Sequence, residues 1–248
     1  MERFKLHNRQ TLAFWLAHWK GMLGALLVYC LAHTFYTLVS SHDSASNNWV
    51  LIVLFEALSV WFFIASILYI DDRSDQKKSS WLMLFSLSFK FIIPYFFLSL
   101  FVGLMGGLAM ILFIVPGIYV LVKYSFTSFN LLFDNASITD SCRMSWDQTK
   151  GYGWLLFSGS LLYFGLPILI WGINFGYDFY LESVLLEPAL LEPALLDHPI
   201  FVFTSNIINY LSWLLATTFM YQVYQTFLQA LMNNPSDVLI DTPSKIIK

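Results

Sequence analysis

The sequence predicts an all-α membrane protein: a polytopic transmembrane helical bundle of about six spans, with short interfacial amphipathic helices. Three observations predict this class. Of the 248 residues, 58% are hydrophobic and only 12% are charged, which is about half the charge of a soluble domain. Apolar runs long enough to cross hydrocarbon alternate with short polar segments. Lysine and arginine outside these runs occur only in alternate polar segments, as in cytoplasmic loops.

The distribution of cations predicts the topology. Basic residues occur before the first apolar run, after the second, after the fourth and after the last: Arg3, Lys5, Arg9, Lys20, Arg73, Lys77, Lys78, Arg143, Lys150, Lys245 and Lys248. The other connecting segments, around 41–48, 103–117 and 174–199, contain none. We therefore expect a single membrane domain over 1–248 in the bacterial cytoplasmic (inner) membrane, with both termini in the cytoplasm.

The first expected elements are an interfacial helix at 1–20 and two spans at 21–40 and 49–70. One helical face of the 1–20 segment carries apolar side chains: Leu12, Trp15, Leu16 and Trp19. A helix with this face suits the inner headgroup region, although the segment can also be read as an extension of span 1. The link between the two spans is short and polar, so the spans should be antiparallel neighbours.

Residues 81–133 have room for spans 3 and 4, which complete four spans over 21–133, but two positions for the turn are open. The turn lies either at Gly103–Gly107 or at Pro116-Gly117. Proline removes a backbone donor and glycine relaxes the backbone, so the Pro-Gly pair is the stronger helix breaker and the preferred turn.

The segment 137–150 predicts a cytoplasmic amphipathic helix. Ser137 is the expected N-cap and Asp140, three residues later, completes a variant capping box. Lys150 and Gly151 place a cation and a helix-stopping glycine at the other end.

Spans 5 and 6 are expected within 153–231, on either side of an outer loop at 174–199. Trp154 and Trp171 lie near the two ends of span 5, as interfacial anchors do. The tail at 233–248 is polar and is expected to be flexible.

Five polar side chains inside the spans form the candidate site, an intramembrane polar cluster: Glu56, Lys90, Tyr119, Lys123 and Asn209. An isolated charge at the centre of a bilayer costs at least about 2.5–3.5 kcal/mol, so these groups should face the bundle interior and pair. Glu56 lies seven residues after Trp49, and Lys123 lies six residues after Gly117. If Pro116-Gly117 is the outer turn, Glu56 and Lys123 are level in the membrane, and we expect them to pair.

Signatures of catalysis or of metal and cofactor binding are not found in the sequence. It contains no HExxH, G-x-S-x-G, P-loop or dinucleotide-binding pattern. Its histidines are scattered without the spacing of metal ligands, and Cys30 and Cys142 fall at different levels, which argues against a disulfide. We expect no catalytic, metal or cofactor-binding residues, and the net charge of −3 argues against nucleic acid as a partner.

One block of the chain resembles a known family. Its residues are Leu112-Phe113-Ile114-Val115-Pro116-Gly117-Ile118-Tyr119, Lys123-Tyr124-Ser125, Ser141, Arg143, Ser145-Trp146 and Lys150-Gly151. The block resembles the YciC-like bacterial inner-membrane proteins, and it is similar to the membrane domain attached to some glycerophosphodiester phosphodiesterases. The resemblance covers about forty residues and implies a six-span protein with a role in envelope or lipid homeostasis. It implies no catalytic residue, because those phosphodiesterases keep catalysis in a separate soluble domain.

The expected function is therefore non-enzymatic, in envelope or lipid homeostasis, through contacts with the lipid bilayer and with other membrane proteins. The alternative is a small-solute or lipid transporter or channel that uses the Glu56–Lys123 polar interior. The two readings differ in whether the charges inside the spans serve function or only fix the packing of helices.

Overall fold

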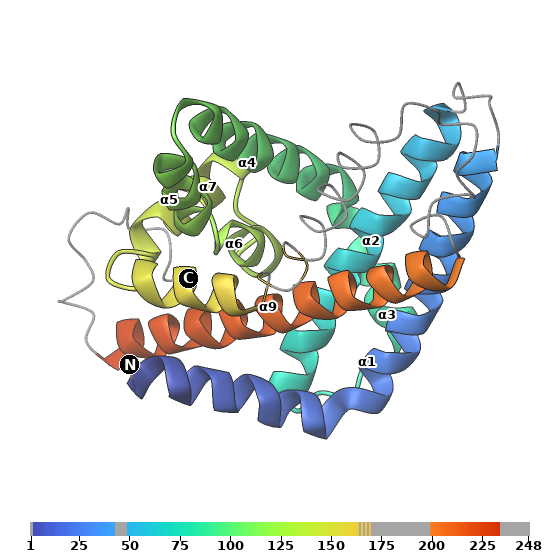
Figure 1. Ribbon diagram of the computed structural model, residues 1–248. Coiled ribbons are helices and arrows are strands. Elements are labelled where there is room, and N and C mark those ends of the chain that lie inside the picture. The colour runs from blue at the N-terminus through green and yellow to red at the C-terminus, as the bar shows by residue number, and fades with distance from the viewer. Residues whose placement is uncertain are drawn as a thin grey trace. The chain divides into compact units, whose positions relative to one another are not determined.

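The computed structural model describes residues 2–42, 49–163 and 199–233, together with 165, 167 and 169. Within these residues all regular elements are helices (Figure 1). Three helices are long and apolar enough to cross a membrane: Glu2–Tyr36, Val53–Ser74 and Trp81–Leu112. The structure thus shows an all-helical protein with helices of membrane-spanning character. The expected outer loop at 174–199 and the tail at 233–248 lie almost wholly outside the described residues.

The long helices are α1 (Glu2–His42), α2 (Trp49–Ser74) and α9 (Pro199–Asn233). Helix α1 continues through Lys20 and Gly21, so no helix end marks the expected boundary between an interfacial segment and span 1. Shorter helices occupy the middle of the chain: α3 (Trp81–Ser88), a 3₁₀ turn η1 (Phe89–Phe91), α4 (Ile92–Leu112), α5 (Ile114–Lys123), α6 (Thr127–Phe133) and α7 (Ile138–Gln148). An apolar helix at Gly153–Tyr163 follows them.

The chain forms two compact units. The first contains Met1–Phe14, Val60–Gly159 and Thr217–Lys248, and the second contains Trp15–Ser59 and Ser160–Ala216. In the second unit Tyr29 of α1 stacks on Tyr210 of α9 at 4.5 Å between ring centroids. The Tyr29 hydroxyl also donates to Ser59 of α2 at 3.3 Å. Polar and aromatic side chains of three helices therefore meet in this unit.

The first unit has an aromatic core around α6. Phe126 and Phe129, beside and within that helix, are buried against Tyr221 and Tyr224 of α9. Helix α6 is buried on most of its surface, because α4, α7 and the end of α9 pack around it. The candidate site described below lies in this unit.

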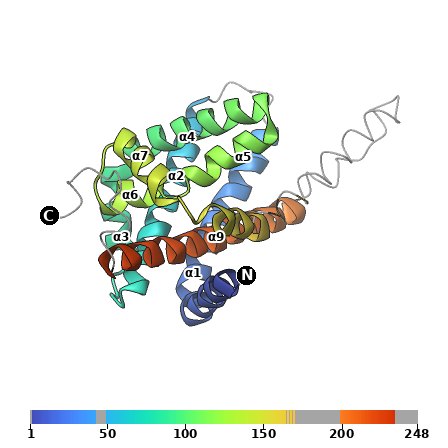
Figure 2. The same cartoon turned by 90° about the vertical axis from the view of Figure 1, so that its left-hand side faces the viewer.

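Helices α4 and α5 form an antiparallel hairpin, which both views show in green (Figures 1 and 2). The turn is at Phe113, whose extended backbone separates the two helices. Gly117 begins the hydrogen bonding of α5 by donating to the carbonyl of Phe113 at 3.2 Å. The turn thus lies three residues before the preferred Pro116-Gly117 pair. The alternative at Gly103–Gly107 is wrong, because α4 runs through those glycines without a break.

The stretch expected to be span 4, 117–133, is not one helix. It consists of α5 and α6, which have 10 and 7 residues and are separated by Tyr124–Phe126. Each is shorter than the roughly 20 residues that cross hydrocarbon. The expected span is therefore corrected to two short helices, and contacts with α7 explain the break between them.

Candidate functional site

Helix α7 is the platform of the candidate site, and its ends are capped as the sequence indicates. The Ser137 hydroxyl accepts the backbone N–H of Asp140 at 3.2 Å and donates to the carboxylate of Asp140 at 2.7 Å. Ser137 is thus the expected N-cap, and the helix starts at Ile138. The Asp140 carboxylate accepts the Ser137 hydroxyl and not the Ser137 backbone N–H, so the expected capping box is formed only in part. Beyond the other end, Gly151 adopts a left-handed backbone with φ of 82°, which glycine tolerates best.

Ser145 of α7 connects the broken ends of α5 and α6. Its hydroxyl donates to the carbonyl of Lys123 at 2.7 Å and accepts the N–H of Phe126 at 3.0 Å. These two bonds replace part of the helical pattern that would otherwise continue through Tyr124. Ser145 is fully buried, so the backbone groups at the break are satisfied without water.

Lys123 ends α5 and is only 6% exposed. Its Nζ donates to the carbonyl of Trp146, in the last turn of α7, at 3.3 Å. The ammonium also lies 5.7 Å from the ring centroid of Tyr119 and 5.6 Å from that of Trp146. The negative end of the α7 dipole, a carbonyl and two aromatic faces thus offset part of the cost of burying this charge.

Asn130 of α6 forms a second buried connection to α7. Its Nδ2 donates to the carbonyl of Ser141 at 3.2 Å and to Oε1 of Gln148 at 2.9 Å. In the described part of the chain, Oδ1 of Asn130 and the hydroxyl of Ser141 have no hydrogen-bond partner. The amide nitrogen of Asn130 therefore orders the contact between α6 and α7, whereas the Ser141 hydroxyl adds little to it.

A cavity of about 450 Å³ opens beside this platform. Its lining combines two cations, one carboxylate, two aromatic rings and a thiol: Tyr124, Cys142, Arg143, Trp146, Asp147 and Lys150. Asp147 and Lys150 form an ion pair at 2.8 Å. The Arg143 side chain is exposed, and its positive charge exceeds what the single carboxylate in the lining can neutralise. The cavity is therefore suited to an anionic group with an adjoining apolar part.

Cys142 lies on the wall of this cavity but is only 7% exposed. Its thiol packs in a small apolar cluster with Leu98 and Leu131. Burial raises the pKa of the Cys142 thiol to about 11. Both Cys142 and Cys30 are free thiols, and the high pKa makes Cys142 a poor nucleophile at neutral pH.

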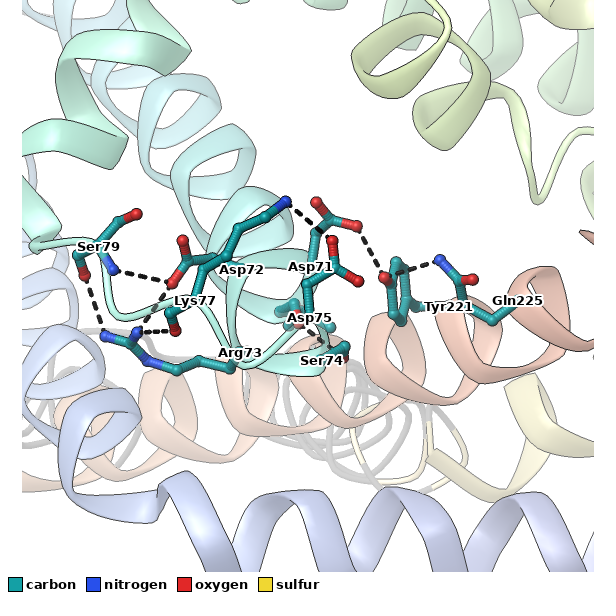
Figure 3. A network of polar contacts seen from close by, with 10 residues as sticks. Asp71, Asp72, Arg73, Ser74, Asp75, Lys77, Ser79, Tyr221 and Gln225 are labelled. Atoms are coloured by element: carbon teal, nitrogen blue, oxygen red, sulfur yellow. Dashed lines mark hydrogen bonds and ion pairs between the residues drawn. The ribbon is translucent and has the colours of Figure 1, made fainter.

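A separate polar network lies at the end of α2, and Figure 3 shows it in detail. The hydroxyl of Tyr221, in α9, donates a hydrogen bond to the Asp71 carboxylate at 2.7 Å and accepts one from Nε2 of Gln225 at 2.8 Å. Through these bonds the end of α2 is connected to α9 within the first unit.

The loop after α2 is closed by its own side chains (Figure 3). Arg73 donates to the carbonyls of Lys77 and Ser79, and it pairs with Asp72 at 2.8 Å. A hydrogen bond from Lys77 to the Asp75 carboxylate raises the pKa of the Lys77 ammonium. The charges of this loop are largely neutralised within it, so we read the loop as structural.

The structure brings together only part of the predicted cluster. Tyr119 and Lys123 are neighbours, whereas the Lys90 ammonium lies over the adjacent Phe91 ring at 4.4 Å. Glu56 and Asn209 are exposed and belong to the second unit. Because Glu56 and Lys123 lie in different units, their pairing stays a prediction.

Sequence reasoning missed the partner that Lys123 has within the first unit. It considered only a carboxylate, although the carbonyls at the end of a helix also attract cations. The signal was the Ser145-Trp146 pair near the expected end of the 137–150 helix. In the described residues no group of three or more His, Cys, Asp or Glu side chains could hold a metal ion.

Comparisons of the chain with family models, curated proteins and solved structures find no match. The YciC-like resemblance therefore rests on the residues that suggested it. Three of those residues meet at one place in the fold: Lys123, Ser145 and Trp146 share hydrogen bonds between α5 and α7.

Proposed function

We propose that this protein is a multi-pass protein of the bacterial cytoplasmic membrane that acts without catalysis in envelope or lipid homeostasis. Both termini and α7 are on the cytoplasmic side in this proposal, and the distribution of Lys and Arg supports this orientation. An even number of crossings belongs to the same proposal, and the apolar runs of the sequence by themselves suggest six. Two observations support the proposal: the number of apolar runs in the sequence, and the three long helices of membrane-spanning character that the structure shows.

The proposed activity is the binding of an anionic lipid headgroup at α7, and one observation carries it. The cavity beside α7 combines Arg143 and Lys150 with the rings of Tyr124 and Trp146. Guanidinium groups bind phosphate oxygens through paired hydrogen bonds, and Trp and Tyr prefer the level of the headgroups. A basic pocket beside membrane helices on the cytoplasmic side is the kind of site that binds anionic headgroups.

The arrangement of α7 supports a binding site better than a catalytic one. The cavity holds a thiol with a high pKa and a carboxylate already paired with Lys150. Neither group is in the state required of a nucleophile or a free general base. Rigid caps and the buried bonds of Ser145 and Asn130 hold the helix in place, which favours recognition of a headgroup by preorganised side chains.

Lipid binding by the full-length protein tests this proposal. The protein is purified in a mild detergent and titrated with phosphatidylglycerol or phosphatidylcholine, and bound lipid is counted by native mass spectrometry. We expect preferential retention of phosphatidylglycerol, and Arg143→Gln should reduce its affinity about tenfold, the equivalent of one charged contact. Lys78→Gln removes the same charge from an exposed position outside the cavity and should leave the affinity unchanged.

Equal retention of the two lipids, or equal effects of Arg143→Gln and Lys78→Gln, would argue against the headgroup site. A deletion strain with normal envelope permeability and lipid composition would argue against the wider role. Uptake of a solute into liposomes that Glu56→Gln abolishes would instead support the transporter alternative.

A further inference from the structure

The tip of the α4–α5 hairpin is unusual because it is both apolar and exposed. Between Lys90 and Lys123 the sequence contains no charged residue. The residues at the tip, 111–115, are all large and apolar, and each exposes between 70% and 82% of its surface. A contiguous patch of this kind in water is unfavourable, and on a membrane protein it marks a surface for hydrocarbon or for a partner.

The hairpin is tightly closed, so this exposure is a property of a packed structure. A Cβ added at Gly117 would lie 2.7 Å from the backbone nitrogen of Met110 and 2.8 Å from its Cα. Further from the turn, a Cβ added at Gly106 would lie 2.5 Å from Cδ2 of Leu121. In each of these contacts the two residues lie at similar distances along the chain from the turn at Phe113. Because the two glycines have no Cβ, the backbones of α4 and α5 can approach each other closely, as at other small-residue helix contacts.

The base of the hairpin lies against α7. Leu98 of α4 packs on Cys142 of α7, and the ring of Phe101 contacts that of Tyr124 at 6.3 Å. Lys123, at the end of α5, caps α7 from the same region. Beyond this base, α5 has 10 residues and extends about 15 Å.

Part of the backbone at the turn is hydrogen-bonded within the hairpin. The N–H of Phe113 donates to the carbonyl of Ala109 at 2.9 Å, and that of Gly117 donates to the carbonyl of Phe113. Pro116 has no N–H and therefore removes one donor that the first turn of α5 would leave unpaired. Ser99, one of the few polar side chains of the hairpin, bonds a carbonyl of its own helix. Each feature lowers the number of polar groups that would face hydrocarbon.

We infer that the α4–α5 hairpin ends inside the membrane, among lipid acyl chains, and returns to the side it entered from. Helix α4 is long enough to cross, but its Leu98 and Phe101 lie at the base beside α7 and Tyr124, so only the residues after them extend beyond that base. The returning helix α5 extends about 15 Å, half of the roughly 30 Å hydrocarbon thickness, and is too short to cross. The arrangement replaces the expected spans 3 and 4 by one re-entrant hairpin. The number of crossings falls by an even number, so the cations before and after the hairpin stay on one side of the membrane. The inference rests on the proposed cytoplasmic position of α7 but not on lipid binding there, because the tip residues 111–115 do not line the cavity.

Cysteine accessibility in proteoliposomes tests this inference. Phe113→Cys places a thiol at the tip, and Lys78→Cys places one in a polar loop as the matched control. The native thiols are buried, so the unsubstituted protein gives the background. A membrane-impermeant maleimide should label Lys78→Cys from one side of the membrane. It should label Phe113→Cys from neither side until the protein is unfolded in SDS.

A spin label at position 113 provides the second measurement and does not rely on the absence of a reaction. The measured quantity is the ratio of the label's collision rate with dissolved oxygen to its collision rate with an aqueous nickel complex. This ratio should be at least tenfold higher for a label at position 113 than for a label at position 78. Leu112→Cys offers the same readout if Phe113→Cys folds poorly. Maleimide labelling at 113 from the side opposite Lys78→Cys would show a crossing, and labelling from the same side would show an aqueous tip. Strong coupling between spin labels at 113 in two copies would show that a second copy covers the tip, and any of these three results overturns the inference.

Discussion

Adding one methyl group at Gly117 should weaken the protein, because this glycine allows α4 and α5 to approach each other closely. A Cβ at this position would meet the Met110 side chain and would lie 2.7 and 2.8 Å from its backbone nitrogen and Cα. Backbone atoms cannot move aside as a side chain can, so the helices must separate. Overpacking costs about 1–3 kcal/mol, and the rigid neighbours place Gly117→Ala at the upper end of that range.

The higher helix propensity of alanine offsets about 1 kcal/mol of this cost. The expected net loss is therefore about 2 kcal/mol in the free energy of unfolding. For a chain of this size, 1 kcal/mol corresponds to roughly 2–4 °C in Tm, so Gly117→Ala should lower Tm by roughly 4–8 °C. The assay is thermal unfolding of the purified protein in one detergent, followed by tryptophan fluorescence.

Two glycines of α4 provide matched controls. A Cβ at Gly107 would have no atom within 4 Å, so Gly107→Ala should leave Tm unchanged or raise it by roughly 2–4 °C. A Cβ at Gly106 would meet only the Leu121 side chain, which can rotate, so Gly106→Ala should fall between the other two variants. A Tm for Gly117→Ala equal to or above that for Gly107→Ala would refute the close crossing of α4 and α5.

Three further predictions concern α7 and its contacts. Asn130→Ala leaves the buried Oε1 of Gln148 without its donor, whereas the carbonyl of Ser141 keeps its helical partner, so the free energy of unfolding should fall by about 2 kcal/mol. Ser141→Ala removes a hydroxyl that has no partner among the described residues and should change the free energy of unfolding by less than about 1 kcal/mol. Similar values for the two variants in chemical denaturation would contradict this assignment. Ser137→Ala removes the N-cap and should cost about 1 kcal/mol, or roughly 2–4 °C in Tm, and an unchanged Tm would count against the cap. Because the pKa of the Cys142 thiol is about 11, little of it is thiolate at pH 7, and the thiolate fraction increases as pH rises. Alkylation of Cys142, followed by mass spectrometry, should therefore be slow in the folded protein and fast in SDS. Rapid labelling of the folded protein at pH 7 would show that the thiol is accessible.

The short helix α7 was predictable because its signals are local. Ser137 and Gly151 act on the backbone within a few residues, and Asp140 bonds the Ser137 hydroxyl, so their spacing alone indicated where the helix begins and where the chain turns after it. The all-helical class was predictable for a related reason: long apolar runs have only one hydrogen-bonded form in lipid other than a closed barrel.

The break between α5 and α6 was not predictable in this way. Residues 117–133 read as one apolar run, and a run of that length suggested a span. The break depends on Ser145, which lies about twenty residues further along the chain and bonds to Lys123 and Phe126. Such a contact exists only when α7 packs against the end of α5.

By itself, the sequence determined the helical class, the membrane character and the caps of α7, because composition and local backbone chemistry are sufficient for these. The tertiary structure alone decided that Lys123 faces the Trp146 carbonyl, that the hairpin turns at Phe113, and that Tyr119 but not Lys90 joins the site. The physical reason is that a buried charge is stabilised by whichever dipoles the packed helices bring within a few ångströms. Several arrangements of the same spans would satisfy the sequence pattern equally well, and packing selects one of them.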